Sequence, residues 1–314
     1  MLNDNGDANW ERNVIARLAS DVLAEQKRAR RWGIAFKILT FGYLFILLFI
    51  GLGWLGQSEV ISTGDHTAVI DVSGVIAADA PANADDIVAG LEQAFEADGT
   101  KAVVLRINSP GGSPVQAANI NDEIRRLRSL HPEIPLYAVI EDICASGGYY
   151  IAVAADQIFV ARSSLVGSIG VLMNGFGFTG TMEKLGVERR LLTAGENKGF
   201  MDPFSPLDAK QRSYAKSMLG EIHGQFIEAV RAGRGDRLKE DKDTFSGLVW
   251  TGERSIELGL TDELGSVSYV AREIVKAETI VNYSWRENIA ERLVRRFGAT
   301  LGQTLVGNTA PRLH

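Results

Sequence analysis

The longest apolar run in the chain lies near its N-terminus, where residues 38–58 contain no charged side chain. A run of that length can cross a bilayer as a helix. Basic residues precede the run and acidic residues follow it: Lys27, Arg28, Arg30, Arg31 and Lys37 come before it, and Glu59, Asp65 and Asp71 come after it. The positive-inside rule then predicts a transmembrane anchor over 34–56, with the segment 1–33 in the cytoplasm and the rest of the chain across the membrane.

A cleaved signal peptide and a buried core helix are the alternatives for this run. A signal peptide begins with a short basic segment, whereas 37 residues precede the uncharged run here. The Gly-Leu-Gly at 51–53 offers the small residues of a cleavage site, but it lies inside the run rather than after it. We therefore expect a retained anchor.

From residue 67 onward, short apolar runs of strand length alternate with segments of helical period. The expected strands are 67–72, 101–107, 136–141, 157–161 and 188–193, and the expected helices are 85–97, 115–130, 146–155, 182–186 and 207–232. This alternation is typical of a layered α/β domain with a largely parallel sheet. We place that domain at 67–283, after a polar connector over 57–66. A C-terminal helical segment over 284–314 follows it, and residues 262–265 are expected to form a turn.

Composition and charge narrow the classes of partner. The 314 residues are 46% hydrophobic and 23% charged, which suits a globular chain with room for one large core or two small ones. The formal net charge is −6, and no long basic stretch lies beyond residue 37, so no nucleic acid partner is expected. The single cysteine, Cys144, forms no internal disulfide. No metal or nucleotide motif is present, and no cofactor is expected.

Two short Gly-rich segments each follow a predicted strand and precede a predicted helix. They are Asn108-Ser109-Pro110-Gly111-Gly112-Ser113 and Ala145-Ser146-Gly147-Gly148-Tyr149-Tyr150. A serine at a strand-to-helix turn sits where backbone N–H groups converge, which suits attack on a carbonyl. A Gly-Gly turn on a neighbouring strand can supply further N–H donors. The pair favours a serine acyl-transfer enzyme, although either segment alone could be a turn that needs glycine for backbone reasons.

An activated serine needs a base. None of the four histidines, His66, His131, His223 and His314, lies in a Gly-rich turn, so a Ser-His-Asp triad is poorly supported. Lysine can replace histidine where burial lowers its pKa, because desolvation disfavours the ammonium. Lys198 lies in a small-residue loop directly after a predicted strand, where α/β sheets tend to place their sites. From the residues alone, it is one candidate among many lysines.

The order and spacing of these motifs resemble the signal peptide peptidase A family, membrane-bound Ser-Lys peptidases on a Clp/crotonase-like layered ββα fold. The matching stretches run from about residue 67 to 270; they are 108–112, 145–150, 167–171, 195–206, and 250–252 leading to 259–265. The single anchor and the single catalytic unit resemble the shorter, non-duplicated form of the family.

The resemblance implies a role for five residues. Ser146 would be the nucleophile and Lys198 its general base. Ser168 resembles the family serine that hydrogen-bonds the lysine and positions its amine. Gly112, with Gly111 beside it, resembles the oxyanion-binding turn, and the N–H of Ser146 would be the second oxyanion donor.

The lysine loop departs from the family pattern. The family often has a basic or aromatic residue two before the lysine and an acidic one after it, whereas Glu196 and Gly199 stand there in this chain. Lys184 and Lys210 fit the pattern worse, so Lys198 is the best match. Cys144, two residues before Ser146, is expected to be a small buried residue.

The function implied is a membrane-anchored serine endopeptidase that degrades cleaved signal peptides and similar apolar membrane peptides. It would lie in the inner (cytoplasmic) membrane with its catalytic domain on the extracytoplasmic side. The family forms homo-oligomeric rings in which the serine and lysine of one site can come from neighbouring chains.

Two other functions fit parts of the pattern. An acyl-CoA hydratase or isomerase of the crotonase type predicts catalytic carboxylates and a cytoplasmic site, and the outward topology argues against it. A non-catalytic membrane scaffold of the same fold would have no need for both Ser146 and Lys198.

Overall fold

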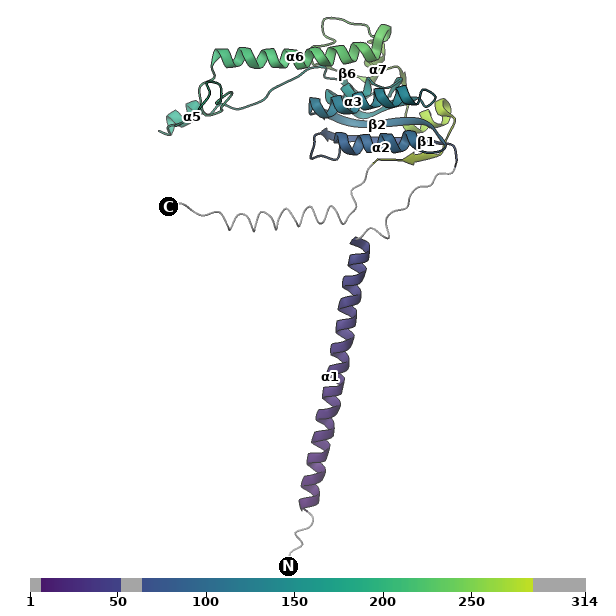
Figure 1. Ribbon diagram of the computed structural model, residues 1–314, viewed down its shortest axis with the longest axis vertical. Helices are drawn as coiled ribbons and strands as arrows, with labels where there is room; N and C mark the ends of the chain where they lie inside the picture. Colours follow the sequence, from purple (N-terminus) through teal and green to yellow (C-terminus); the bar gives the residue numbers. More distant parts are fainter. Residues whose placement is uncertain (1–6, 52–63, 285–314) are drawn as a thin grey trace, which may run out of the picture. The chain divides into compact units, whose positions relative to one another are not determined.

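The computed structural model describes residues 7–51 and 64–284 (Figure 1). These residues fall into two compact units: one holds the helix α1 (Asp7–Gly51), and the other holds every remaining helix and strand. The predicted C-terminal segment over 284–314 lies outside the described residues except for Ser284. Most of the predicted connector over 57–66 lies outside them as well.

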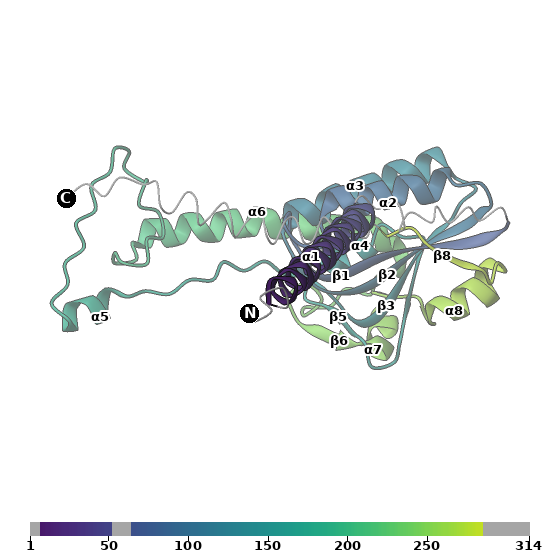
Figure 2. The ribbon, with the colours of Figure 1, turned by 90° about the horizontal axis from the view of Figure 1, so that it is seen from below.

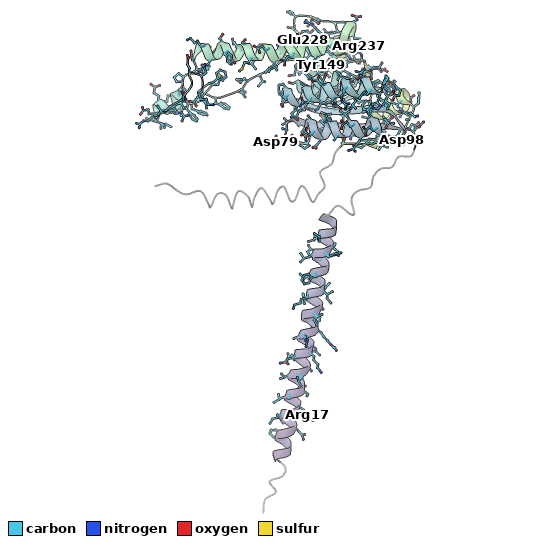
Figure 3. All side chains as sticks on the ribbon, in the orientation of Figure 1. Arg17, Asp79, Asp98, Tyr149, Glu228 and Arg237 are labelled. Atoms are coloured by element: carbon cyan, nitrogen blue, oxygen red, sulfur yellow. The ribbon has the colours of Figure 1, made fainter. Side chains whose placement is uncertain are left out.

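α1 is a continuous helix of 45 residues. Its part Asn13–Leu48 is long and apolar enough to cross a membrane, and none of its most apolar window is buried. Figure 3 shows the side chains of α1, Arg17 among them, standing out from the helix. A candidate membrane span therefore lies where the sequence predicts an anchor.

The second unit is built on one mainly parallel sheet. In the described residues its strands are β1 (His66–Ile76), β2 (Thr100–Gly112), β3 (Leu136–Ala145), β4 (Gln157–Val160), β5 (Leu165–Gly167), β6 (Val249–Thr251), β7 (Glu263–Leu264) and β8 (Ile280–Asn282). The order is β6-β5-β3-β2-β1-β8, with β4 beside β3 and β7 beside β4. Among these pairs β5–β6 is antiparallel and the others are parallel. The predicted α/β class with a largely parallel sheet is confirmed.

Several helices of this unit begin where a side chain caps them. They are α2 (Ala84–Glu96), α3 (Pro114–Leu130), α4 (Gly147–Ala152), α5 (Thr179–Lys184), α6 (Ala209–Arg234), α7 (Gly252–Glu257) and α8 (Val267–Tyr269), with a 3₁₀ turn at Gly235–Arg237 and a π turn at Val270–Val275. Asn83 caps α2 by accepting the N–H of Asp86. Ser113 caps α3, whose first residue is a proline that lacks the N–H a cap would have to satisfy.

The core lies on both faces of the sheet. Alternate residues of β1, such as Ala68 and Ile70, pack under α2 and α3, whereas Val69 packs on the opposite face with Val104 and Val270. Figure 2 shows α2 and α3 along one face and α8 on the other. Because the central strands are covered on both sides, they read as continuous apolar runs rather than alternating ones.

β2 and β3 run further than the sequence predicts. The expected strands end at residues 107 and 141, whereas β2 continues to Gly112 and β3 to Ala145. β1 runs beside β2 as far as the pair Ile76–Gly112, and β5 pairs with the end of β3. The Gly-rich end of β2 would form a turn in isolation, but hydrogen bonds to the neighbouring strands keep it extended. In the same way, residues 263–264 form strand β7 rather than the expected turn.

The predicted strand over 188–193 is wrong. These residues are irregular and exposed, and within the described chain no strand pairs with them. A strand without a neighbour leaves its backbone groups without ladder partners, so a short apolar run is not enough to form one.

Residues 171–208, here called the arm, leave the sheet after β5 and lead into α6. Figures 1 and 2 place α5, which belongs to the arm, near the N-terminal end of α6 and away from the sheet. The C-terminal half of α6 packs on the rest of the unit: Phe226 and Val230 are buried, and the rings of Tyr150 and Phe226 lie 5.1 Å apart. The expected long helix over 207–232 is confirmed.

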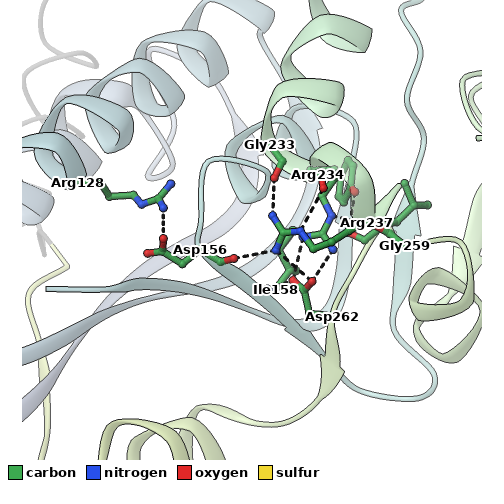
Figure 4. A network of polar contacts seen from close by, with 10 residues as sticks. Arg128, Asp156, Ile158, Gly233, Arg234, Arg237, Gly259 and Asp262 are labelled. Atoms are coloured by element: carbon green, nitrogen blue, oxygen red, sulfur yellow. Dashed lines mark hydrogen bonds and ion pairs between the residues drawn. The ribbon is translucent and has the colours of Figure 1, made fainter. Parts of the chain in front are cut away.

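A buried ion pair fixes the end of α6 to the sheet (Figure 4). Arg234, of whose side chain 1% is exposed, donates to both carboxylate oxygens of Asp262 at 2.9 and 2.7 Å and to the carbonyl of Gly259 at 2.8 Å. Asp262 also accepts the N–H of Ile158 in β4 at 2.7 Å. Burial opposes ionisation of Asp262, but the Arg234 hydrogen bonds and charge outweigh it, so the pKa of Asp262 lies below its usual value.

We expect Arg234→Met to lower the free energy of unfolding by about 3–5 kcal/mol, because it leaves a buried carboxylate without its main partner. Denaturant unfolding of the full chain at pH 7 measures this change. The matched control is Arg231→Met in α6, which removes an exposed ion pair with Glu240 and should leave the midpoint near that of the wild type. Equal midpoints for the two variants would contradict a stabilising role of the Arg234–Asp262 ion pair.

The same pair gives a pH dependence with a defined sign. Because the pKa of Asp262 is lowered on folding, its contribution is present above the unfolded value of about 3.9 and is lost as the pH falls through the folded value. Asp262→Asn should therefore be less stable at pH 7 and should lose less stability than the wild type on acidification below pH ~4.

Candidate active site

Ser146 occupies a strained turn between β3 and α4. Its φ is 50° and its ψ is −122°, a conformation that a residue with a Cβ adopts only when its surroundings impose it. Its N–H donates to the carbonyl of Gly167 at 2.8 Å, and its carbonyl accepts the N–H of Tyr150 at 2.9 Å. A sharp strand-to-helix turn of this kind is how a nucleophilic serine is presented at the edge of a sheet.

Two glycines let the end of β2 approach this turn. A Cβ on Gly111, which has φ of 99°, would lie 2.7 Å from the backbone nitrogen of Gly147 and 2.7 Å from the Cβ of Ser146. A Cβ on Gly112 would lie 2.1 Å from the carbonyl oxygen of Ile76. Any other residue at either position would push the two strands apart, so glycine is required here for steric reasons.

The resemblance implies the N–H of Ser146 as an oxyanion donor, but in this structure that N–H donates to the Gly167 carbonyl. The N–H of Gly111 is also engaged, since it donates to the Oγ of Ser109 at 3.1 Å. Gly147 is the first residue of α4, and the N–H at that position has no acceptor within the helix. A Cβ on Gly147 would lie 3.3 Å from the nitrogen of Gly112, so Gly112 lies beside Gly147, and the N–H groups of these two residues are the candidate donors.

A cavity of about 900 Å³ opens beside these groups. Ser146, Gly147, Gly112 and Ser168 line it. Apolar side chains of α3, α4 and α6 form much of the remaining wall, including Val115, Ala117, Ala118, Tyr150, Ile222 and Phe226. The cavity therefore joins a potential nucleophile and backbone N–H donors to a mostly apolar surface.

Ser168 lies in a second strained turn, directly after β5. Its φ is 51°, and its N–H donates to the carbonyl of Leu248 at 2.7 Å. Gly167 before it packs against the Trp250 ring so closely that a Cβ would lie 2.6 Å from the ring. The sequence predicted neither β5 nor the packing of Gly167 on Trp250. The feature of the sequence that indicated a functional position here is the serine between the glycines of 167–170.

Lys198 is not brought to the cavity of its own chain. It lies in the arm with its side chain exposed, and it is not among the lining residues. The described part of the chain contributes no lysine, histidine, aspartate or glutamate to that lining. One chain thus assembles Ser146, Gly111, Gly112 and Ser168, but leaves the predicted base outside.

The loop that carries Lys198 is held by contacts within the arm and with α6. Asp202 accepts the Ser205 hydroxyl at 2.6 Å and lies 3.5 Å from Arg189, which also stacks over the Phe204 ring. The N–H of Met201 donates to the side chain of Gln211 in α6 at 3.2 Å. The loop is therefore ordered by local polar contacts although it lies apart from the cavity.

Other candidate groups are accounted for. Cys144 is fully buried, as expected, and burial raises the pKa of its thiol, so no thiolate is available there. His66 is buried and bonded to Tyr283, and His131 packs on Phe95. Tyr149, labelled in Figure 3, is buried as well and donates its hydroxyl to the carbonyl of Leu260 at 2.7 Å. In the described residues no group of three or more His, Cys, Asp or Glu is placed to hold a metal ion.

A strained serine with two neighbouring backbone N–H groups at an apolar cavity fits the site of a serine acyl-transfer enzyme. A model of the peptidase family S49 matches residues 128–280. A Synechocystis protein provisionally named protease slr0021 is 31% identical over 65% of this chain and 72% of its own. The chain belongs to peptidase family S49, and the expected Clp/crotonase-like fold class is confirmed.

Two further relatives align with only part of their own length. An Enterococcus faecium protein provisionally named signal peptide peptidase SppA is 31% identical over 58% of this chain and 53% of its own. A Brucella melitensis protein named Na(+)/H(+) antiporter NhaA is 41% identical over 69% of this chain. The aligned region spans only 28% of that relative's length.

Proposed function

We propose that this chain is a membrane-anchored serine endopeptidase in which Ser146 is the nucleophile and Lys198 the general base. The observation that carries the proposal is the strained Ser146 turn, which lies beside the nitrogens of Gly112 and Gly147 at an apolar cavity. Membership of a peptidase family supports the same reaction class.

The proposed reaction follows from these positions. The Oγ of Ser146 attacks a peptide carbonyl while the neutral amine of Lys198 takes the hydroxyl proton. The N–H groups of Gly112 and Gly147 stabilise the oxyanion. The C–N bond then breaks, the proton passes from the lysine to the leaving amine, and an acyl-enzyme remains. A water then gives a proton to the same lysine and attacks the ester carbonyl; the bond from that carbon to the Ser146 Oγ breaks, and the lysine returns the proton to the Oγ.

We infer that the base comes from a neighbouring copy of this chain. The cavity of one described chain contains no basic side chain, and the arm that carries Lys198 has large exposed apolar residues. These include Leu172, Phe176, Leu185 and Leu192, of which Leu192 is 95% exposed. An exposed apolar surface of this extent is typical of an interface. A homo-oligomeric ring would cover it and would bring Lys198 of one copy to Ser146 of the next.

The proposed substrates are cleaved signal peptides and similar apolar membrane peptides. The apolar wall of the cavity suits apolar side chains, and an anchor would hold the site close to the bilayer. The Enterococcus faecium relative carries the name of a signal peptide peptidase. A crotonase-type reaction is less well supported, because the described cavity lining has no carboxylate.

Ser146→Ala and Lys198→Ala should each lower kcat by at least about 10³-fold, because the two residues act as one unit. Lys198→Arg should fail as well, since a guanidinium stays protonated. Peptide hydrolysis and labelling by a fluorophosphonate measure the loss. Lys184→Ala, which changes another lysine of the arm, is the matched control and should retain activity. Near-normal turnover by Lys198→Ala would place the base elsewhere, and a wild type that is never labelled would favour the scaffold.

We also propose that the chain lies in the inner membrane with its N-terminus in the cytoplasm and the peptidase domain outside. The basic residues before the apolar run support this orientation. Protease added to spheroplasts should then digest the domain beyond residue 64 and spare the segment 1–33. Protection of the domain until the membrane is opened would contradict the orientation.

A further inference from the structure

Residues 167–170, here called the Ser168 turn, join the nucleophile to the arm. The carbonyl of Gly167 accepts the N–H of Ser146 at 2.8 Å, and the N–H of Ser168 donates to Leu248 at 2.7 Å. These two bonds fix the first half of the turn. The positive φ of Ser168 is a strained conformation, so contacts of the second half of the turn, Ile169 and Gly170, are also needed to maintain it.

The second half of the turn is held from α6. The Nε2 of His223 lies 3.2 Å from the carbonyl oxygen of Ile169, the residue that follows Ser168. A carbonyl only accepts, so the bond requires a proton on Nε2. Ile169 is fully buried, and the side chain of His223 is half-buried. His223 thus meets the turn from an element that also lines the cavity through Ile222 and Phe226.

We propose that His223 is a positioning residue that holds the Ser168 turn in the conformation that presents the Ser168 hydroxyl to the amine of Lys198. The inference rests on the proposed function of Ser146 and Lys198. His223 itself touches no reacting group: its neighbours Ile222 and Phe226 line the cavity, and its own ring does not. It acts through the backbone of Ile169 and not as a base.

Two amide substitutions distinguish a role of the His223 hydrogen bond from a role of its side chain in packing alone. His223→Gln places an amide N–H at about the position of Nε2 and keeps the bond to Ile169. His223→Asn ends at the position of Nδ1 and cannot reach the carbonyl. Because one hydrogen bond is lost, His223→Asn should lower kcat about tenfold with little change in KM, whereas His223→Gln should stay within about threefold of the wild type.

The second readout is the pH at which the rate of fluorophosphonate labelling is half-maximal. A Ser168 hydroxyl that donates to the neutral amine of Lys198 favours the neutral form, so loss of this contact in His223→Asn should shift the midpoint upward, as Ser168→Ala should. In the Ser168→Ala background, His223→Asn should lower kcat little further, because both changes act on the contact between Ser168 and Lys198. His131→Asn, the same change at a histidine remote from the cavity, should leave kcat and midpoint unchanged.

Wild type and Ser146→Ala are measured in the same series. If the wild type is not labelled, or Ser146→Ala still is, the proposed function fails and this inference fails with it. If labelling depends on Ser146 but His223→Asn matches the wild type, only the positioning role is overturned. Loss of activity in a folded His223→Gln variant would overturn the positioning role as well. So would a Ser168→Ala, His223→Asn double variant whose loss of kcat equals the product of the two single losses.

Discussion

The hydrogen bond from the N–H of Ser146 to the carbonyl of Gly167 is the contact on which the site depends. It helps to hold Ser146 at a positive φ, and it turns that N–H away from a role as oxyanion donor. The N–H of Gly147, which lies beside Gly112, is then left as a candidate donor. Because Gly167 belongs to β5 and Ser168 follows it, the same bond couples the proposed nucleophile to the residue expected to meet the lysine.

Close approach of strands makes this coupling possible, and it accounts for the two Gly-rich motifs. The end of β2 lies against the Ser146 turn at a separation that a Cβ on Gly111 would not allow. Parallel pairing with β1 carries β2 as far as Gly112. The glycines therefore act through packing between neighbouring strands, and their conformational freedom is used to reach that packing without a clash.

Much of the sheet and of the serine side of the site could be predicted from the sequence. Doubly buried strands such as β1 and β2 read as apolar runs, and Ser146 and Ser168 stand in Gly-flanked motifs. What could not be predicted depends on partners distant in sequence. β2 stays extended to Gly112 only because β1 lies beside it, the segment 188–193 has no strand to pair with, and the bond that occupies the N–H of Ser146 comes from β5.

The central claim is that the cavity of one chain is completed by Lys198 of another. A single described chain brings the serine, the candidate oxyanion donors and Ser168 together but leaves the lysine on an arm rich in exposed apolar residues. The direct test mixes Ser146→Ala and Lys198→Ala chains under conditions in which mass spectrometry confirms subunit exchange. A shared site predicts that activity returns, because some interfaces pair an intact Ser146 with an intact Lys198. Complete exchange without any recovered activity would show that each site is built within one chain.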